Sequence, residues 1–351
     1  MHKKHLNICV AGVSGYVGNE LIKLVKAHPH LQLAGFLDVR EQGLTTALPG
    51  CDDDYPIYTI NELRKGHGDI DVLCLATPPQ ISIDCISVLH KKPLKIIDLS
   101  GAFRLPTDDL KAWYGLQHDV ESLSSGATYG LSPWANQSIE QAPVIANPGC
   151  YATCALMALL PLLQYQVIQS TNIIIDAKSG VTGAGKSPNA NLMLAEMLDN
   201  FFPYKVGNHQ HVPEINQCLA HFTDSLFNVI LNTQLLPIKR GIAMTVYCDA
   251  SDSLAGDEEI MKIIQASYET CYGDYPLIKF HALNQGLAQQ DKAILSLNNV
   301  VGTPFTHVGY FVKEGKVFLY CCIDNLLKGA ASQAIENINL SYQWPLATGL
   351  V

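Results

Sequence analysis

The chain has 351 residues, of which 48% are hydrophobic, and it carries a formal net charge of -9 at pH 7. This length allows two domains of about 150 residues, and the hydrophobic content is sufficient for a core in each. The acidic balance, with no block of Lys and Arg, argues against a nucleic-acid partner and favours a small-molecule substrate.

Eleven cysteines are scattered along the sequence without a repeated CxxC or a Cys/His ladder. This pattern argues against a disulfide framework and a metal site, and it predicts a reducing, cytoplasmic location. The most apolar stretch, residues 150–163, is shorter than the roughly 20 residues that cross a bilayer, so we expect no membrane segment. We interpret the basic and apolar N-terminus as a first strand rather than a leader.

Short apolar runs alternate with helical patterns in the first 150 residues. We predict strands at 6–10, 31–37, 72–76 and 96–99, and a helix at 20–26. Strands separated by helices form parallel sheets with right-handed crossovers. This part of the chain is therefore predicted to be an α/β domain of the Rossmann type, which binds dinucleotides.

A glycine-rich turn, Gly-Val-Ser-Gly-Tyr-Val-Gly at residues 12–18, joins the first strand to the first helix. Glycines in this context let the backbone approach a pyrophosphate, which then binds at the helix N-terminus. The GxxGxxG spacing differs from GxGxxG, so a purely structural turn is the alternative. The residues expected to bind the cofactor here are Gly12, Ser14, Gly15, Tyr16, Val17 and Gly18.

Polar residues follow the other predicted strands of this sheet. Asp38 would bind the ribose hydroxyls of NAD, whereas Arg40 would pair with the additional phosphate of NADP, so the two residues indicate different cofactors. Thr77, Pro78 and Ser100 come where later strands end, which is the edge where open α/β sheets bind ligands. An ordinary turn explains them equally well, because such residues are common in turns.

A cysteine stands at the start of a long apolar helix, in the sequence Asn-Pro-Gly-Cys-Tyr at residues 147–151. The backbone amides and the positive end of the helix dipole would stabilise a thiolate there. Cys150 is therefore a candidate nucleophile. The alternative is that Cys150 is a small buried hydrophobic residue, as most cysteines outside secreted proteins are.

The pattern changes after this helix to strands with the alternation of a half-buried antiparallel sheet. We predict an α+β domain with a mixed, largely antiparallel sheet. The expected strands are 173–177, 228–236, 243–248, 293–297, 306–311 and 316–322.

The chain ends in a helix predicted from residue 324 onward. Its apolar spacing at Ala331, Ala334, Ile335 and Ile338 predicts one buried face. We assign this helix to the first domain. The expected domains are 1–149 with 325–351, which bind the cofactor, and 150–324, which carries catalysis and oligomerisation.

Two polar segments of the second domain are expected to carry further site residues. Residues 179–186 form a glycine-rich loop that would wrap a phosphate or the nicotinamide ribose, although they lack the spacing of a Walker loop. Residues 207–214 present two histidines on one side of a predicted extended segment. Such a pair has too few partners for a metal site, and histidine titrates near neutrality, so a general acid/base is favoured.

Taken together, these motifs resemble those of the N-acetyl-gamma-glutamyl-phosphate reductase family, within the aspartate-semialdehyde dehydrogenase superfamily. The resemblance covers nearly the whole chain, and the order and spacing of the motifs support it. The matching segments are 12–18, 98–104, 129–131, 147–151, 179–185, 209–215 and 324–331.

The resemblance implies an NADP-dependent acyl-phosphate reductase of arginine biosynthesis. It would reduce N-acetyl-L-glutamyl 5-phosphate to N-acetyl-L-glutamate 5-semialdehyde and release phosphate. Cys150 would form a thioester, and His211, the histidine before Val-Pro-Glu, would be the acid/base. Such enzymes are usually homodimers or homotetramers.

The resemblance also assigns the remaining site residues. Asn325 would approach the nicotinamide end of the cofactor, with Gly183 and Gly185 beside it. Arg104 would hold a carboxylate or phosphate of the substrate, because a planar guanidinium suits both groups; a surface ion pair is the alternative. The residues expected to bind the substrate are Arg104, Asn147, Ser179, Gly180, Tyr204 and Glu214.

The sequence departs from the family pattern at two positions. Asp38 stands where many relatives carry small hydroxyl residues, which bears on the preference for NADP. Gln210 replaces an arginine that is common between the two histidines, which bears on substrate contacts.

Three other functions are considered. An aspartate-semialdehyde dehydrogenase would use the same cysteine chemistry on a shorter substrate. A lysine-pathway reductase of carrier-bound amino-adipyl phosphate would need a basic surface for its acidic carrier, and this chain is acidic. A non-catalytic nucleotide sensor would not need Cys150, Arg104 and His211 together.

Overall fold

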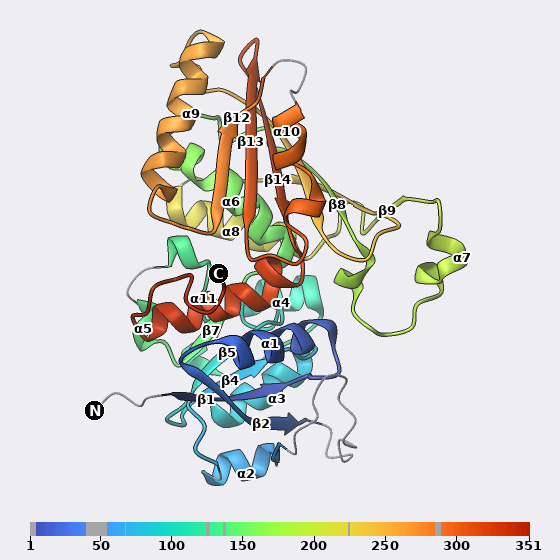
Figure 1. Ribbon diagram of the computed structural model, residues 1–351, viewed down its shortest axis with the longest axis vertical. Helices are drawn as coiled ribbons and strands as arrows, with labels where there is room; N and C mark the ends of the chain where they lie inside the picture. Colours follow the sequence, from blue (N-terminus) through green and yellow to red (C-terminus); the bar gives the residue numbers. More distant parts are fainter. Residues whose placement is uncertain are drawn as a thin grey trace. The chain divides into compact units, whose positions relative to one another are not determined.

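The computed structural model describes residues 5–39, 55–66, 68–123, 127–135, 138–223, 225–284 and 289–351. The chain divides into two compact units, shown in Figure 1. The first unit consists of Met1–Gly149 and Ala330–Val351, and the second of Cys150–Gly329. Each unit is built on one sheet.

Every pairing between the described strands of the first unit is parallel. The strand order is β3-β2-β1-β4-β5-β7-β6. The order reverses between β1 and β4, and ligands of doubly wound sheets bind at the strand carboxyl ends beside such a point. The Rossmann-type fold predicted from the sequence is confirmed. The strands are β1 Leu6–Ala11, β2 Leu31–Asp38, β3 Ile57–Thr59, β4 Val72–Leu75, β5 Lys95–Asp98, β6 Thr128–Tyr129 and β7 Val144–Ala146.

Helices α1 and α3 of the first unit each bury one apolar face. Leu21 and Val25 are fully buried on α1, as are Ile86 and Leu89 on α3, and this spacing of three or four residues places each pair on one helix face. Helix α2 begins with a capping box between Thr59 and Glu62. The helices are α1 Tyr16–Ala27, α2 Ile60–Lys65, α3 Pro79–Leu89, α4 Thr107–Tyr114, α5 Ser138–Gln141 and α11 Ser332–Ser341.

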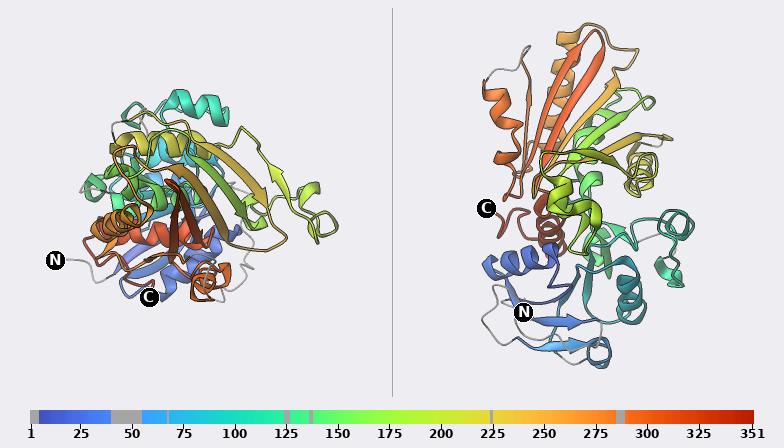
Figure 2. Two further views of the ribbon diagram at one scale, coloured as in Figure 1. Left: turned by 90° about the horizontal axis from the view of Figure 1, so that it is seen from above. Right: turned by 90° about the vertical axis from the view of Figure 1, so that its right-hand side faces the viewer.

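The second unit has the strand order β12-β13-β14-β11-β8-β10-β9. The β8/β10 and β12/β13 pairs are parallel and the others antiparallel, so the predicted mixed, largely antiparallel sheet is confirmed. Its strands fan out in a twisted sheet (Figure 2). The strands are β8 Ile174–Ser179, β9 Phe202–Tyr204, β10 Ile230–Leu235, β11 Ile242–Asp249, β12 Ile278–Ala282, β13 Thr306–Lys313 and β14 Lys316–Ile323.

Helices α6 and α9 cover one face of this sheet, and α8 packs against α6. Pro161 within α6 has no N–H group, so the carbonyl of Met157 lacks its usual helical donor. The Tyr272 hydroxyl on α9 donates to that carbonyl at 2.9 Å, and the Tyr268 hydroxyl donates to the carbonyl of Ala158 at 2.6 Å. The helices are α6 Cys150–Gln164, α7 Leu194–Met197, α8 His211–Thr223, α9 Asp257–Tyr272 and α10 Gln289–Ile294.

The predicted strand at 293–297 is wrong. The chain forms helix α10 up to Ile294 and then a 3-10 turn, Leu297–Asn299. Helix-forming residues, two Gln and a Lys, precede the short apolar alternation and extend the helix into it. The carbonyl of Ile294 hydrogen-bonds to the ring of His307 at 2.7 Å rather than to a neighbouring strand.

The predicted extended segment at 207–214 is wrong at its C-terminal half, because α8 begins at His211. Pro213 lies in the first turn of this helix, where its missing N–H costs nothing and its fixed φ suits the helix. The two histidines therefore lie at a helix start.

The last helix buries the predicted apolar face, but its other faces are buried as well. The chain forms a π-helical turn, Leu327–Ala331, followed by α11. Ala334 and Ile335 are buried as expected, but the polar residues Gln333, Glu336 and Asn337 on the other faces are fully buried too. Each of these three side chains makes at least one hydrogen bond within the first unit, which offsets part of the cost of burial. Gln333 donates to the carbonyl of Gly130.

None of the helices in the described parts of the chain is long and apolar enough to cross a membrane. The same parts contain no group of three or more His, Cys, Asp and Glu residues placed to hold a metal ion.

Candidate active site

The glycine-rich turn of the first unit is packed so closely that two of its glycines cannot carry a side chain. Gly12 has φ +76°, and a Cβ there would lie 2.1 Å from the carbonyl oxygen of Ala76. A Cβ on Gly18 would lie 2.4 Å from the carbonyl oxygen of Gly12. Between them, Gly15 is the N-cap of α1. The turn therefore brings the positive end of α1 to the carboxyl end of β1.

The carboxyl edge of this sheet also carries predicted cofactor residues that end or follow three further strands. Asp38 ends β2, Thr77 follows β4 and Ser100 follows β5, and all three are buried. Thr77 shares a hydrogen bond of 2.9 Å with Ser82, at the start of α3. Pro78 is the N-cap of α3. Arg40 lies outside the described residues.

Asp98 organises the loop after β5. This fully buried carboxylate accepts hydrogen bonds from the backbone N–H and the hydroxyl of Ser100, both at 3.0 Å. Burial raises the pKa of Asp98, while the bonds from Ser100 and the charge of Arg104 act in the opposite direction.

Arg104 is buried and held by backbone carbonyls. Its Nε donates to the carbonyl of Asn147 at 2.8 Å and its Nη2 to the carbonyl of Leu99 at 2.9 Å. The guanidinium is therefore fixed in orientation beside the loops after β5 and β7, as anion recognition requires.

Asn147 connects the loop after β7 to the C-terminal segment. Its backbone N–H donates to the carbonyl of Asp98 at 2.8 Å. Its side-chain amide donates to the carbonyl of Ala330 at 3.2 Å and accepts from Asn337 at 3.0 Å. The Asn147 side chain is fully buried, so these contacts fix the segment that leads to Cys150.

Cys150 is the first residue of α6, a helix of 15 residues, and its side chain is partly exposed. Only Cys271 is similarly accessible among the described cysteines. The next cysteine on the helix, Cys154, is fully buried, and burial raises its pKa. The helix therefore places one thiol at its positive end and in reach of a ligand.

The two histidines form a pair at the start of α8. Their ring centroids are 4.8 Å apart, and Nδ1 of His209 accepts a hydrogen bond from the backbone N–H of His211 at 3.1 Å. Burial, and then the neighbouring His211, lower the pKa of His209 to about 2. His209 is therefore neutral, with its proton on Nε2. Its hydrogen bond holds the backbone of His211 at the helix start.

Tyr151 links Cys150 to this pair. The residue directly after Cys150 has its ring centroid 5.2 Å from that of His209 and 5.9 Å from that of His211, both edge to face. The buried carboxylate of Glu214, one turn along α8, has an oxygen 4.0 Å from Nε2 of His211. This carboxylate would stabilise positive charge on the His211 ring.

Two tyrosines and a serine form a chain of hydroxyl groups beside the histidines. Tyr204, which ends β9, donates to the Tyr151 hydroxyl at 2.7 Å, and Tyr151 hydrogen-bonds to Ser179. The Ser179 hydroxyl donates to the carbonyl of Gly180 at 2.9 Å. Burial raises the pKa of both tyrosines, so both phenols keep their protons.

The glycine-rich segment after β8 folds into a 3-10 turn, Val181–Ala184. A Cβ on Gly180 would lie 2.7 Å from the backbone nitrogen of Arg240, so only glycine fits at the start of this turn. Gly183 lies within the turn and Gly185, with φ +81°, ends it.

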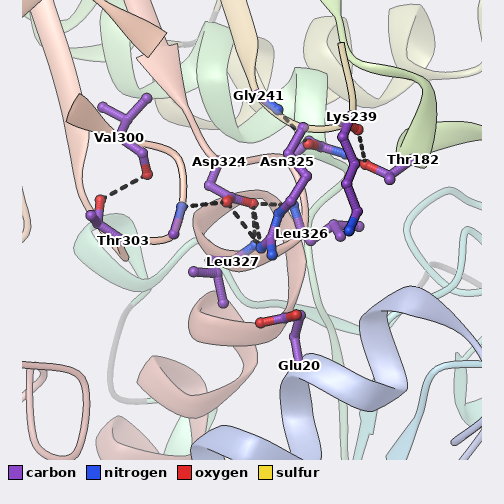
Figure 3. A network of polar contacts seen from close by, with 12 residues as sticks. Glu20, Thr182, Lys239, Gly241, Val300, Thr303, Asp324, Asn325, Leu326 and Leu327 are labelled. Atoms are coloured by element: carbon purple, nitrogen blue, oxygen red, sulfur yellow. Dashed lines mark hydrogen bonds and ion pairs between the residues drawn. The ribbon is translucent and has the colours of Figure 1, made fainter. Parts of the chain in front are cut away.

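Asn325 ties this turn to the segment before β11, as Figure 3 shows. Its Oδ1 accepts from the backbone N–H of Gly241 at 2.8 Å, and its Nδ2 donates to the hydroxyl of Thr182 at 3.1 Å. The Thr182 hydroxyl in turn donates to the carbonyl of Lys239 at 2.7 Å. The amide of Asn325 is thus held in one orientation.

Gln210 stands between the two histidines. Its side-chain carbonyl accepts a hydrogen bond from the ammonium group of Lys205. A positive charge is therefore present beside this position, although it comes from Lys205 rather than from an arginine at position 210.

Comparison with known proteins matches both units to domains of semialdehyde dehydrogenases. Residues 7–142 match the family model of the semialdehyde dehydrogenase NAD binding domain, and residues 150–325 match that of the semialdehyde dehydrogenase dimerisation domain. N-acetyl-gamma-glutamyl-phosphate reductase from Bacillus cereus (strain AH187) is 36% identical over 98% of both chains. The enzyme of that name from Streptococcus gordonii is 35% identical, covering 99% of this chain and 98% of its own. The chain belongs to the N-acetyl-gamma-glutamyl-phosphate reductase family.

Solved structures more distant in sequence share the fold. Aspartate semialdehyde dehydrogenase II from Vibrio cholerae superposes with a TM-score of 0.68 at 16% identity, over 97% of this chain and 99% of its own. The aspartate semialdehyde dehydrogenase from Candida albicans, solved with NADP, gives 0.64 at 15% identity, over 96% and 98%. As a member of the reductase family, this chain binds a nicotinamide dinucleotide.

Several residues of this reductase-family site were missed in the sequence. Asp98, Tyr151 and Asp324 each lie within a recognised motif, but nothing in their spacing indicates which contacts they make. Arg240 lies 84 positions before Asp324, and Gly329 is far in sequence from Cys150. Only the folded chain brings them together.

Proposed function

We propose that the protein reduces N-acetyl-L-glutamyl 5-phosphate to N-acetyl-L-glutamate 5-semialdehyde with NADPH and releases phosphate, as a step of arginine biosynthesis. The observation that carries this proposal is the position of Cys150. It is a partly exposed thiol at the start of α6, and the next residue packs against both histidines. The names of relatives that match over nearly the full length supply the substrate.

In the first half of the reaction, the Cys150 thiolate attacks the carbonyl carbon of the acyl phosphate. A C–S bond forms, the C–O bond to phosphorus breaks, and inorganic phosphate leaves. Covalent catalysis thereby replaces one difficult step by two easier ones. The positive end of α6 stabilises the thiolate before the attack and the oxyanion that forms during it.

In the second half, a nicotinamide dinucleotide held by the first unit would supply the hydride that reduces the thioester carbon. His211 provides the proton that the resulting tetrahedral oxyanion or the departing thiolate takes up, and the C–S bond breaks to give the aldehyde. Glu214 stabilises the charged form of His211, and His209 holds the backbone of His211 in place.

The predicted substrate residues fit an anionic substrate. Arg104 presents a fixed guanidinium suited to a carboxylate or a phosphate. Tyr204 and Ser179 belong to the chain of hydroxyl groups that includes Tyr151, and the carbonyl of Gly180 accepts the hydrogen bond of Ser179. Asn147 acts from within the first unit by holding the segment before Cys150.

The cofactor site fits a dinucleotide at the carboxyl edge of the first sheet. The closely packed Gly12–Gly18 turn brings the α1 N-terminus to the position where a pyrophosphate binds in such folds. Gly183, Gly185 and Asn325 would serve the nicotinamide end. We propose NADP(H) as the preferred form, with Arg40 as the partner of its additional phosphate.

The assay runs the reaction in reverse, with N-acetylglutamate semialdehyde, phosphate and either NADP or NAD, and with aspartate semialdehyde in parallel. We expect phosphate-dependent formation of NADPH from the acetylated substrate. Faster turnover of aspartate semialdehyde would assign the protein to that activity instead. Cofactor binding without turnover of either aldehyde would favour the sensor.

The second unit supports assembly into a homodimer or homotetramer. Its dimerisation-domain match is accompanied by a row of apolar side chains across five neighbouring strands, on the face opposite α6 and α9. Paired positions connect them along the row, and Ile174, Ile230 and Tyr247 are 40%, 60% and 40% exposed. The row consists of Ile230, Ile174, Tyr247, Phe318 and Phe311.

The described cysteines are all free thiols. This supports the proposed cytoplasmic location, because reducing compartments keep thiols from pairing.

A further inference from the structure

Asp324 is a fully buried carboxylate at the end of β14, and backbone and side-chain donors surround it (Figure 3). Its Oδ1 accepts from the backbone N–H groups of Leu326 at 2.8 Å and Leu327 at 3.0 Å. Its Oδ2 accepts from the backbone N–H of Gly302 at 2.8 Å. Arg240 contacts both oxygens, at 3.0 and 2.9 Å. The carboxylate of Asp324 therefore holds the connection from β14 to the π-helical turn in place through these contacts.

This connection leads directly to the nucleophile. The backbone N–H of Gly329 donates to the carbonyl of Asp324 at 2.9 Å, so Gly329 is fixed relative to the acid. A Cβ on Gly329 would lie only 2.7 Å from Cβ of Cys150 and 3.2 Å from its Cα. The backbone of Gly329 in the π-helical turn thus packs directly against Cys150, with no room for a side chain between them. Such turns are rare and are frequent at functional sites.

The same carboxylate also fixes Asn325. The amide of Asn325 binds the backbone of Gly241, which is the neighbour of Arg240. Asn325 follows Asp324 and Gly241 follows Arg240, so the ion pair between Arg240 and Asp324 holds both partners of the Asn325–Gly241 hydrogen bond in place. Arg240 is 17% exposed in its side chain and Asp324 not at all, so solvent screens the pair weakly.

We propose that Asp324, through its ion pair with Arg240, is a positioning residue that sets two parts of the reductase site together. It places Gly329 against Cys150, which fixes the direction of the thiol, and it places the amide of Asn325 beside the glycine-rich turn. This inference rests on the proposed role of Cys150 as the nucleophile.

The test compares Asp324→Asn with Asp249→Asn in the full chain. Asp249 pairs with Lys316 on the same unit, but Lys316 is 64% exposed, so this variant removes an ion pair that does not reach the site. The readouts are the rate of Cys150 alkylation by iodoacetamide as a function of pH, located by mass spectrometry, and the Kd of NADPH. Thermal unfolding reports whether each variant folds.

We expect Asp324→Asn to lower kcat about tenfold or more, because small displacements of reacting groups cost that much. Alkylation of Cys150 should slow with a shifted pH profile, and NADPH should bind more weakly. Asp249→Asn should change none of these. Unchanged alkylation and NADPH binding in a folded Asp324→Asn protein would overturn the proposal.

Two further variants separate the two parts and remain informative if Asp324→Asn does not fold. Gly329→Ala should alter alkylation while NADPH binding stays unchanged, and Asn325→Ala should weaken NADPH binding with little change in alkylation. Arg240→Lys keeps the charge and should restore part of what Arg240→Gln loses. Alkylation at the wild-type rate in Gly329→Ala would overturn the link to Cys150.

The alkylation and NADPH-binding readouts do not depend on the acetylated substrate. If the wild-type protein fails to turn over that substrate, the proposed function fails, whereas alkylation and NADPH binding still decide the role of Asp324.

Discussion

At the scale of single residues, side chains of the same type differ in exposure and in charge because their surroundings differ. Cys150 is partly exposed at a helix start, whereas Cys154 one turn later is sealed in the core. Likewise His209 is held neutral by burial, and its neighbour His211 lies beside a carboxylate. The sequence could single out Cys150 and His211, since the motifs place both at informative positions, but burial alone gives His209 its supporting role.

Substitution of the proposed nucleophile should remove turnover. We expect Cys150→Ser to lower kcat more than about 1,000-fold, because loss of a covalent nucleophile is among the most costly changes in an active site. NADPH should bind as in the wild type. Cys271→Ser is the matched control, since Cys271 is the other partly exposed described cysteine. Equal activity in the two variants would exclude the thioester route.

The neutral state of His209 predicts how stability depends on pH. Its folded-state pKa is lowered to about 2, so below about pH 6.5 the unfolded chain takes up a proton that the folded protein rejects. Stability is therefore lost as pH falls through the unfolded pKa. This group alone should cost roughly 2 kcal/mol at pH 5.

Urea denaturation at pH 7.5 and pH 5 tests this linkage. The variant His209→Asn keeps an acceptor for the backbone N–H of His211 but does not titrate, so it should lose less stability on acidification than the wild type. His221→Asn, at the exposed end of the same helix, serves as control. Equal acid sensitivity in the wild type and His209→Asn would contradict the prediction.

At the scale of elements, apolar periodicity predicted strands and helices well where one face is buried. It failed where other forces decide, as in the α10 segment, where helix-forming residues outweigh a short alternation. It also failed for α11, whose polar faces are buried against partners distant in sequence. No local pattern could predict this, because the partner of Asn337 is Asn147, 190 positions away.

Removal of one of these buried partners should destabilise the first unit. We expect Asn337→Ala to lower the free energy of unfolding by about 1–3 kcal/mol, because it leaves the buried Oδ1 of Asn147 without this donor. Gln80→Ala removes a hydrogen bond of the same length, to Asp84, from an exposed site on α3 and should be nearly neutral. Chemical denaturation of both variants measures the difference, and equal losses would contradict a buried amide network.

At the scale of the whole molecule, the family and the fold class of both units could be predicted from the sequence because motifs follow several of the strands. The short or edge strands β3, β6, β7, β9 and β12 were not predicted. The periodicity of the sequence does not show which exposed side chains are neighbours on adjacent strands of the second sheet. That follows from the register, which pairs Ile174 with both Ile230 and Tyr247.

The aligned apolar row predicts the surface through which copies assemble. An Ile174→Asp variant places a charge within the row, between Ile230 and Tyr247, where burial without a partner is costly. We expect it to shift the protein toward monomers in size-exclusion chromatography with light scattering. Leu226→Asp is the control, because Leu226 is 93% exposed and lies outside the row. An Ile174→Asp protein that assembles like the wild type would place the interface elsewhere.

The two-part composition of the first unit has a consequence for biogenesis. Its core includes Gln333 and Glu336, which bind Gly130 and Ser132, so residues 1–149 leave the ribosome without the groups that complete their interior. The second unit is continuous in sequence, so its folding does not depend on a later segment of the chain. During translation, the second unit can fold first, and the first unit is completed only after residues 330–351 emerge.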